Sequence, residues 1–257
     1  MLNSNIQNHP VNTRAVATLP LMAHWVLGYP TLPESERIIL ELAEAGVQYL
    51  ELQIPFSHPT ADGPLITAAN RTALASGTTL HEALAVVARI KAAYPAQHIV
   101  LMTYTNKVSA FGYEAFARQA LQAGATGLIL PDLPFDALEA DKLRAEGIQL
   151  IPVLGPNISD ERLQILLKQH PKLVYRMAGY KITGSSFGLD VRLAGLVQTL
   201  RNAGAKVGIG FGISTPGQVQ AVLEIADFAI IGSSLLNAYA GTGVRNYLLK
   251  VKSPNHL

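Results

Sequence analysis

The sequence predicts an α/β fold, a single (β/α)₈ barrel, from three observations. The chain has 257 residues, a length at which such barrels commonly form one domain. A short phrase recurs in which a helix-like segment ends at Ala-Gly or Glu-Gly and a run of strand-forming residues follows at once. Helical segments also separate eight apolar strand candidates. This alternation of helix and buried strand is typical of a parallel sheet.

The recurring phrase has four plain copies. Gly46, Gly124, Gly147 and Gly204 each stand where the C-terminus of a helix needs a residue that tolerates a positive φ. The apolar run after each glycine suits a strand that is buried on both faces. The eight expected strands are residues 21–27, 47–54, 98–104, 126–130, 148–154, 173–177, 206–210 and 227–232.

Helix and domain boundaries fit the same plan. Pro33 stands near the start of the first expected helix, and Thr79 with Glu82 predicts a capping box for the helix HEALAVVARIKAAY. The turn after the first strand, LGYPTLPE, is not the GxGxxG fingerprint of an open dinucleotide-binding sheet, which favours the barrel. Residues 1–19, polar and Asn-rich, are expected to form an N-terminal arm, and residues 20–257 the barrel domain.

The composition excludes several function classes. With 49% hydrophobic and 15% charged residues, the chain can bury a large core and is not disordered. The formal net charge is +2 with scattered basic residues, so no nucleic acid partner is expected. The chain has no cysteine, which excludes disulfides and thiolate chemistry. No apolar run approaches the about 20 residues of a membrane span, and the N-terminus lacks an apolar signal core. A cytoplasmic enzyme that binds no membrane is the default expectation.

Two carboxylates stand where a barrel places its chemistry, at the C-terminal end of a strand and in the loop that follows. Alternation along VQYLELQI points Glu51 into the barrel near its mouth, where burial raises a carboxyl pKa toward neutrality. The residues alone leave equal room for a buried Glu paired with a Lys or His. Asp62 follows in the loop PFSHPTADGP and can converge on the same cavity. Taken alone, an Asx turn before a helix is the favoured interpretation of Asp62.

The string LELQIPFSHPTADGPLITAA resembles the signature of the tryptophan synthase alpha chain family. Between residues 20 and 240, further segments match that family in the same order: VLGYP, LMTYTNKV, GLILPDLP, ITG, GFGIST and IIGSSL. The resemblance implies a TIM barrel lyase that splits indole-3-glycerol phosphate into indole and glyceraldehyde 3-phosphate by a retro-aldol reaction. It implies no cofactor and no metal, and a beta subunit partner in an alpha2beta2 heterotetramer.

The resemblance also assigns roles to side chains. Glu51 matches the family's proton-transfer residue, and Asp62 matches the partner of the indole N–H. Tyr104 lies on the inward parity of the third strand and matches an aromatic residue that flanks the substrate. Tyr175 and Ile66 match further wall positions. Ordinary core packing explains these two equally well, and for Ile66 it is the stronger explanation.

A phosphate site follows from glycines at strand ends. Barrels often bind phosphate through backbone N–H groups on the loops after the seventh and eighth strands and at the start of a short helix. Gly212 in GFGIST and Gly232 with Ser233 in IIGSSL stand at those places. Gly184 follows the sixth strand, and Thr183 beside it is expected to contact the substrate. A turn is the alternative for each glycine by itself.

Four departures from the family pattern cluster at the expected active end. Gln53 stands in place of a glycine on the same inward face as Glu51. His58 replaces an aspartate on the loop that contacts the beta subunit, and residues 178–181 read AGYK in place of Ser-Arg-x-Gly. His24 and Trp25 occupy the first strand, where the family has small or apolar residues. These changes leave the carboxylate pair intact but alter the polarity of the mouth.

The departures leave three interpretations open. The leading one is a lyase of the family's type, acting alone or with a divergent beta subunit. The second is action on another phosphorylated substrate, with Lys181 as a Schiff-base amine, although an exposed loop lysine is the more ordinary explanation. The third is a non-catalytic paralogue that binds a partner or metabolite. Tight binding of a phosphorylated ligand without turnover would identify that third case.

Two departures carry expectations of their own. Alternation and the family match point His24 into the barrel and Trp25 toward the outer helices. A hydrogen-bonding His24 within reach of Glu51 and Gln53 is expected to slow cleavage of the unsubstituted indole substrate, or to favour a ring with a polar substituent. His58 is expected to weaken activation by a typical beta subunit, because it leaves a donor or cation of the partner without its anion.

Overall fold

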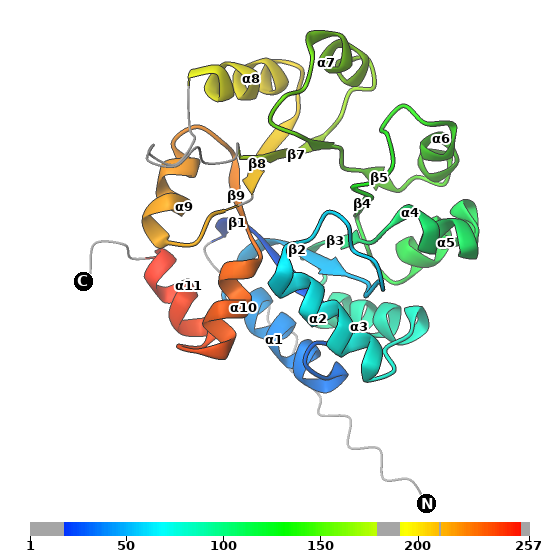
Figure 1. Cartoon of the computed structure of the whole chain (residues 1–257), viewed down its shortest axis with the longest axis vertical. Coiled ribbons are helices and arrows are strands. Elements are labelled where there is room, and N and C mark those ends of the chain that lie inside the picture. Colours follow the sequence, from blue (N-terminus) through cyan, green and yellow to red (C-terminus); the bar gives the residue numbers. More distant parts are fainter. Residues whose placement is uncertain (1–17, 179–190, 211, 253–257) are drawn as a thin grey trace, which may run out of the picture.

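A computed structural model describes residues 18–178, 191–210 and 212–252. Parallel strands form a curled sheet at the centre, and helices surround it (Figure 1). The strands are β1 (Leu19–Val26), β2 (Val47–Gln53), β3 (His98–Met102), β4 (Gly127–Ile129), β5 (Gln149–Leu150), β6 (Val153–Leu154), β7 (Leu173–Met177), β8 (Lys206–Gly210) and β9 (Phe228–Ile231). The helices are α1 (Leu32–Glu44), α2 (Pro64–Ala75), α3 (Leu80–Ala93), α4 (Thr105–Phe111), α5 (Tyr113–Gln122), α6 (Leu138–Ala145), α7 (Asp160–Leu167), α8 (Val191–Asn202), α9 (Pro216–Leu223), α10 (Ser233–Ala240) and α11 (Val244–Lys252).

The sheet closes through a single chain segment. Its strand order is β5-β4-β3-β2-β1-β9-β8-β7-β6, so the first and last strands are consecutive in the sequence. Between them, the Ile151 N–H donates to the Leu128 carbonyl at 2.9 Å, and the Tyr175 N–H donates to the Pro152 carbonyl at 3.0 Å. The segment thus bonds to β4 on one side and to β7 on the other. The predicted fold class, a (β/α)₈ barrel, is confirmed.

The prediction of one continuous fifth strand, residues 148–154, was wrong. The structure has two short strands there, β5 and β6, with Ile151 and Pro152 between them. Proline has no backbone N–H to donate to a strand ladder, so regular pairing stops at this point. The first strand also differs slightly, because it begins at Leu19, the last residue of the expected arm.

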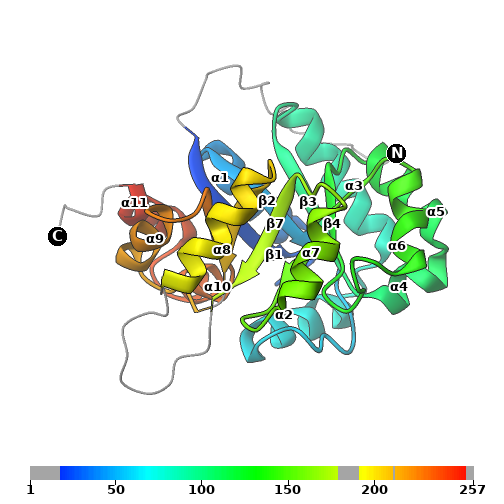
Figure 2. The same ribbon diagram turned by 90° about the horizontal axis from the view of Figure 1, so that it is seen from above.

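The helix boundaries follow the sequence signals. Pro33 lies in the first turn of α1, and Gly46 after this helix has φ 82°. The capping box of α3 is complete, since the Thr79 hydroxyl accepts from the Glu82 N–H and the Glu82 carboxylate accepts from the Thr79 N–H. Seen from above, helices cover the outside of the barrel (Figure 2). Among the described residues, no helix has the length and apolar character that crossing a bilayer requires.

Two apolar cores hold the barrel. The larger one lies between the strands and the helices and includes Trp25, whose ring packs edge-on against Tyr239 of α10 at 5.7 Å. The smaller one fills the barrel interior. Glycine makes room for two of its large rings, because a Cβ at Gly208 would collide with Phe228 and a Cβ at Gly210 would meet the Tyr175 hydroxyl. The members of the inner core are Met22, Tyr49, Val100, Met102, Tyr104, Ile129, Ile151, Leu173, Tyr175, Phe228 and Ile230.

Candidate functional site

Polar side chains begin directly above the inner core, toward the C-terminal ends of β1 and β2. The two strands pair in parallel, with His24 opposite Glu51 and Val26 opposite Gln53. Because successive residues of a strand alternate between its faces, Glu51 and Gln53 share the inward face with Tyr49. His24 and Glu51 are each 4% exposed, and Gln53 is fully buried. The inward orientation predicted for His24 and Glu51 is confirmed.

His24 and Glu51 form a buried pair. The Nδ1 atom of His24 lies 3.3 Å from Oε1 of Glu51. Burial by itself lowers the pKa of His24, but the neighbouring Glu51 carboxylate, together with Asp62 and Gln53, outweighs it and raises the pKa above the ordinary value. The arrangement therefore favours an imidazolium beside a carboxylate, the condition under which a buried charge pair is tolerated.

Asp62 joins this cluster from the loop between β2 and α2. Its Oδ2 accepts hydrogen bonds from Gln53 Nε2 at 2.7 Å and from the Tyr104 hydroxyl at 3.0 Å. Burial raises the pKa of Asp62, while the charge of His24 and the two hydrogen bonds oppose that rise. Burial and Asp62 also raise the pKa of Tyr104, which therefore remains a neutral donor. The carboxylate of Asp62 thus bonds to inward side chains, as a residue of the site does.

The loop that carries Asp62 is held at both ends. The Tyr104 hydroxyl accepts from the Ala61 N–H at 3.0 Å, and the Tyr104 ring stacks on Phe56 with 5.0 Å between centroids. Asn70, 1% exposed on α2, accepts from the Phe56 N–H at 2.9 Å and donates to the Ile66 carbonyl at 2.9 Å. Asn70 was missed by the sequence analysis. Its signal was a polar residue beside Ala69 and Ala73 on the buried face of an apolar helix.

A second missed residue is Asp132, which lies within the matched segment GLILPDLP. Its carboxylate accepts from the Thr105 N–H at 2.9 Å and from the Thr105 hydroxyl at 2.8 Å. This contact ties the loop after β4 to the start of α4. The acidic residue follows a buried strand directly, which is the position that could have singled it out.

The expected phosphate side lies next to His24. Gly232 immediately precedes α10, and a Cβ placed on it would stand 3.3 Å from His24 Cβ and 3.5 Å from Ile66 Cδ1. Ser233 is the first residue of α10, whose free N–H groups and positive dipole end favour an anion. Gly212 has φ 81° and open space around a Cβ. A side chain at Gly232 would therefore crowd His24 and contact Ile66.

The remaining predicted residues are placed as follows. Tyr175 on β7 is 9% exposed, and its pKa is raised by burial and by the charges of Glu51 and Asp62, so it faces the same interior. Thr183 and Gly184 lie outside the described residues, as does most of the AGYK stretch with Lys181. His58 is exposed, with its Nδ1 2.9 Å from the Ser57 hydroxyl.

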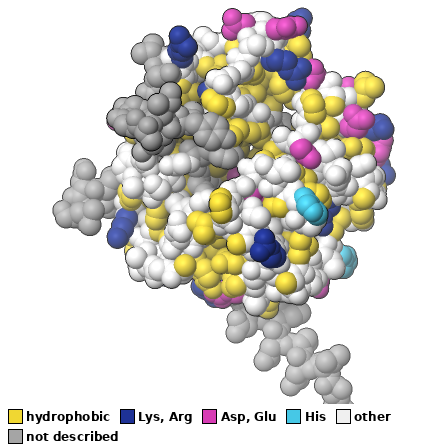
Figure 3. All heavy atoms as spheres, viewed as in Figure 1, with side chains coloured by type: hydrophobic (Ala, Val, Ile, Leu, Met, Phe, Trp, Pro, Cys, Tyr) yellow, Lys and Arg dark blue, Asp and Glu magenta, His cyan; other side chains and the backbone are white. Residues whose placement is uncertain are grey.

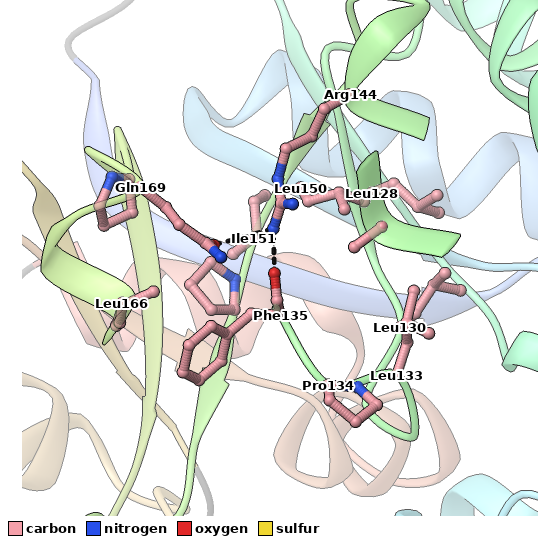
Figure 4. A pocket seen from close by; sticks show the side chains of 13 residues that line it. Leu128, Leu130, Leu133, Pro134, Phe135, Arg144, Leu150, Ile151, Leu166 and Gln169 are labelled. Carbon is pink, nitrogen blue, oxygen red and sulfur yellow. Dashed lines mark hydrogen bonds between the residues drawn. The ribbon is translucent and has the colours of Figure 1, made fainter. Parts of the chain in front are cut away.

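Two cavities lie away from this cluster. One, of about 50 Å³, is mostly apolar and lies outside the sheet; there Arg144 donates to the Phe135 carbonyl and to Gln169 (Figure 4). The other, of about 320 Å³, lies at the N-terminal ends of the strands and is lined in part by His98, Lys172 and Lys206. None of the predicted site residues lines either cavity.

A metal site finds no support in the described part of the chain, and a polyanion site finds none on the face that Figure 3 shows. Among those residues, no three His, Asp or Glu side chains are grouped so that they could hold a metal ion. Lys and Arg side chains are scattered over the face seen in Figure 3. His24, Glu51 and Asp62 at the mouth are side chains of the types that can transfer protons, and the first turn of α10 lies beside them.

Comparisons with known proteins agree with this geometry. The family model described as Tryptophan synthase alpha chain matches residues 12–251. The tryptophan synthase alpha chain of Syntrophotalea carbinolica is 34% identical over 249 residues, which cover 95% of this chain and 96% of that protein. The one from Lactiplantibacillus plantarum is 38% identical, covering 85% and 84%.

Solved structures show the same similarity. A chain of tryptophan synthase from Mycobacterium tuberculosis matches with a TM-score of 0.81 and 30% identity, and 93% of each chain is covered. A mutant tryptophan synthase alpha-subunit from Pyrococcus furiosus matches with a TM-score of 0.79 and 27% identity, covering 91% of this chain and 97% of that one.

Proposed function

Because the chain belongs to the tryptophan synthase alpha chain family, we propose that Glu51 and Asp62 are the residues with which it performs the family's reaction. That reaction cleaves indole-3-glycerol phosphate to indole and glyceraldehyde 3-phosphate, and the enzyme is a carbon–carbon lyase. The observation that carries the assignment is the convergence of two carboxylates at the C-terminal mouth of the barrel, the buried Glu51 from β2 and the half-buried Asp62 from the following loop.

Cleavage makes three demands on the site. The ring carbon that bears the glycerol chain needs a proton, the hydroxyl that becomes the aldehyde needs a base, and the ring N–H needs a partner as positive charge develops. Glu51 serves proton transfer. Asp62 accepts the hydrogen bonds from Gln53 and Tyr104 with Oδ2, so its other carboxylate oxygen can accept the ring N–H. The burial of Glu51 and the partial burial of Asp62 strengthen their interaction with the developing charge.

The substrate's two ends are assigned to opposite sides of the mouth. Tyr104, Tyr175 and Ile66 form walls for the ring, and Thr183 contacts the substrate beside them. The phosphate group binds backbone N–H groups of Gly184, Gly212, Gly232 and Ser233. Support comes from the start of α10 at Ser233 and from the close approach of Gly232 to His24, where a Cβ would make a tight contact of 3.3 Å.

A beta subunit is the proposed protein partner, in an alpha2beta2 heterotetramer. His58 is exposed on the loop between β2 and α2, where the family pattern has an aspartate. A partner surface that presents a donor or cation to that aspartate meets a histidine here. Weak activation by a typical beta subunit is therefore expected, and His58→Asp is expected to restore part of it.

The direct test is an assay of the purified protein with indole-3-glycerol phosphate. Equal amounts of indole and glyceraldehyde 3-phosphate are the expected products, and a beta subunit is added in a parallel reaction. Binding of the substrate without either product, alone and with the beta subunit, would contradict the proposal. Full activation of the unmodified protein by a typical beta subunit would contradict the role given to His58.

A further inference from the structure

Three buried polar atoms at the mouth have no hydrogen-bond partner among the described residues. They are His24 Nε2, Glu51 Oε2 and Gln53 Oε1. Each belongs to a residue that is at most 4% exposed. A buried polar atom without a partner costs about 1–3 kcal/mol, so native structures seldom keep several together unless a ligand supplies the missing bonds. The Gln53 amide also raises the pKa of His24 through a side-chain hydrogen bond, so a ligand would share the imidazole with Gln53 and meet Glu51 Oε2 as a free acceptor.

Three polar groups act on the His24 imidazole. Glu51 on β2, Asp62 on the next loop and the Gln53 amide all act on His24, and each raises its pKa. From β7, Tyr175 faces the same two carboxylates, which raise its pKa as well. Gly232, directly before α10, approaches both His24 and Ile66 of α2, and neither Gly232 nor Ile66 carries a charge. No Lys or Arg of the described residues acts on the pKa of His24, so the imidazolium form is favoured.

The position of His24 matches one part of the substrate. Its Nδ1 side contacts Glu51 at 3.3 Å. On the other side of the ring, Cδ2 lies 3.6 Å from where a Cβ of Gly232 would stand. Nε2 is bonded to Cδ2 and therefore lies on that side of the ring. His24 thus lies between the proton-transfer carboxylate and the proposed phosphate site. That is where the glycerol chain and the bond to be broken would lie.

The reaction needs a donor as well as a base. If Glu51 serves as the base for the hydroxyl, it cannot also supply the proton to the ring carbon in the same step. Tyr104 and Tyr175 have raised pKa values, which make them weak acids near neutrality. Asp62, whose pKa burial raises, is assigned to the ring N–H, so the imidazolium of His24 is the acid that remains for the ring carbon.

We propose that His24 is the proton donor of the cleavage and Glu51 its base, an inference that rests on the proposed function. The Nε2 proton of His24 moves to the ring carbon that bears the glycerol chain, which leaves a neutral imidazole and a cationic ring. Oε2 of Glu51 then takes the proton of the neighbouring hydroxyl. The O–H electron pair becomes the second bond of the aldehyde, the carbon–carbon bond breaks, and its electron pair neutralises the ring.

The cycle closes with water alone. After cleavage, His24 lacks one proton and Glu51 holds one more than at the start, so the protein's total is unchanged. Exchange with water as the products leave restores both groups. No oxidant, reductant or further reactant is needed.

The test measures kcat and KM for indole-3-glycerol phosphate between about pH 6 and about pH 9 in wild type, His24→Gln and His24→Phe. The wild-type kcat is expected to fall at alkaline pH as the imidazolium loses its proton. At neutral pH both variants should lose about 10²–10⁴-fold in kcat with little change in KM, and their residual rate should lack the alkaline fall. The matched control is His81→Gln, an exposed histidine on α3, which should behave as wild type.

The outcomes distinguish a failure of the proposed function from a failure of the role given to His24. An inactive wild type contradicts the proposed function, and the inference falls with it. An active wild type with variants within about threefold of its kcat overturns the inference alone. A faster His24→Phe also overturns it, because that result means that His24 only makes the mouth polar. Slow variants that keep the alkaline fall would make His24 a positioning residue.

A second measurement does not depend on how the variants fold. The imidazole of His24 is titrated in the wild-type protein with ¹⁵N-labelled histidine, and its signal is identified by its loss in His24→Gln. The inference requires a cationic ring at neutral pH. A neutral ring there would overturn the assignment of His24 as the donor.

Discussion

The inner faces of β1 and β2 change from apolar to polar within one step along the barrel axis. In the lower layer Met22 pairs with Tyr49, and the Tyr49 ring lies 4.8 Å from that of Phe228. Two residues further along, His24 pairs with Glu51. Both layers are almost completely buried, but burial stabilises the lower layer and costs the upper one the solvation of two charges. The lower layer accounts for folding, and the upper layer is explained by chemistry.

The largest effect is expected in the upper layer. Glu51→Gln keeps the shape of the side chain but removes its capacity to take a proton. We expect kcat to fall by at least about 10²–10⁴-fold with nearly unchanged substrate affinity, as for the loss of a general acid–base group. Steady-state kinetics measure the loss of kcat, and calorimetry measures the substrate affinity. Glu44→Gln, at an exposed residue of α1, is the control. A near-native rate in Glu51→Gln would contradict the role of Glu51 in proton transfer.

The lower layer should show the opposite pattern. Phe228→Ala removes a ring that is fully buried against Tyr49 and should cost about 3–5 kcal/mol of the free energy of unfolding. Its kcat, per folded molecule, should remain near wild type. Urea denaturation provides the measurement, and Leu249→Ala, which is 55% exposed, is the control with an expected change within about 0.5 kcal/mol. A stable Phe228→Ala with lost turnover would break the division between the layers.

A smaller effect is expected at the edge of the upper layer. Gly232→Asp adds bulk beside His24 and a negative charge where the phosphate is proposed to bind. We expect the Kd for glycerol 3-phosphate to rise at least about tenfold in calorimetry, a loss of about 1.4 kcal/mol. Gly195→Asp on α8, where a Cβ meets nothing within 4 Å, adds the same charge as a control. Equal affinities in Gly232→Asp and wild type would mean that the phosphate site is elsewhere.

The smallest effect concerns pH and stability. The folded-state pKa of His24 is raised above its ordinary value of 6.5. The pair with Glu51 therefore stabilises the fold fully below that value, and this contribution is lost as the pH rises through the raised pKa. Urea denaturation should show a steeper loss of stability on the alkaline side of pH 6.5 for wild type than for His24→Gln. Parallel curves would show that His24 is not charged in the folded protein.

The comparison of the layers also shows what the sequence could predict. Alternation along a strand is fixed by its geometry, so the inward direction of Glu51 followed from the residues alone, while that of His24 also needed the family match. The barrel followed from four helix-to-strand glycines and the spacing of apolar runs. The break at Pro152 was missed because apolar patterning records burial and carries no information about backbone donors.

Contacts between elements were harder to predict. The bond from Gln53 to Asp62 depends on how the loop after β2 folds back over the mouth, which Tyr104 and Asn70 decide from other elements. A turn was the favoured interpretation of Asp62 taken alone, because that motif is local and needs no distant partner. Only the three-dimensional arrangement brings its carboxylate onto inward side chains.

The most direct test of the account is a crystal structure of Glu51→Gln with indole-3-glycerol phosphate bound. The account predicts an uncleaved substrate in the mouth of the barrel. Its reacting hydroxyl should lie within hydrogen-bond distance of residue 51, its ring N–H at Asp62, and its phosphate at the N–H groups of Gly232 and Ser233. A substrate bound in another place, such as the cavity lined by Lys172 and Lys206, would contradict the account.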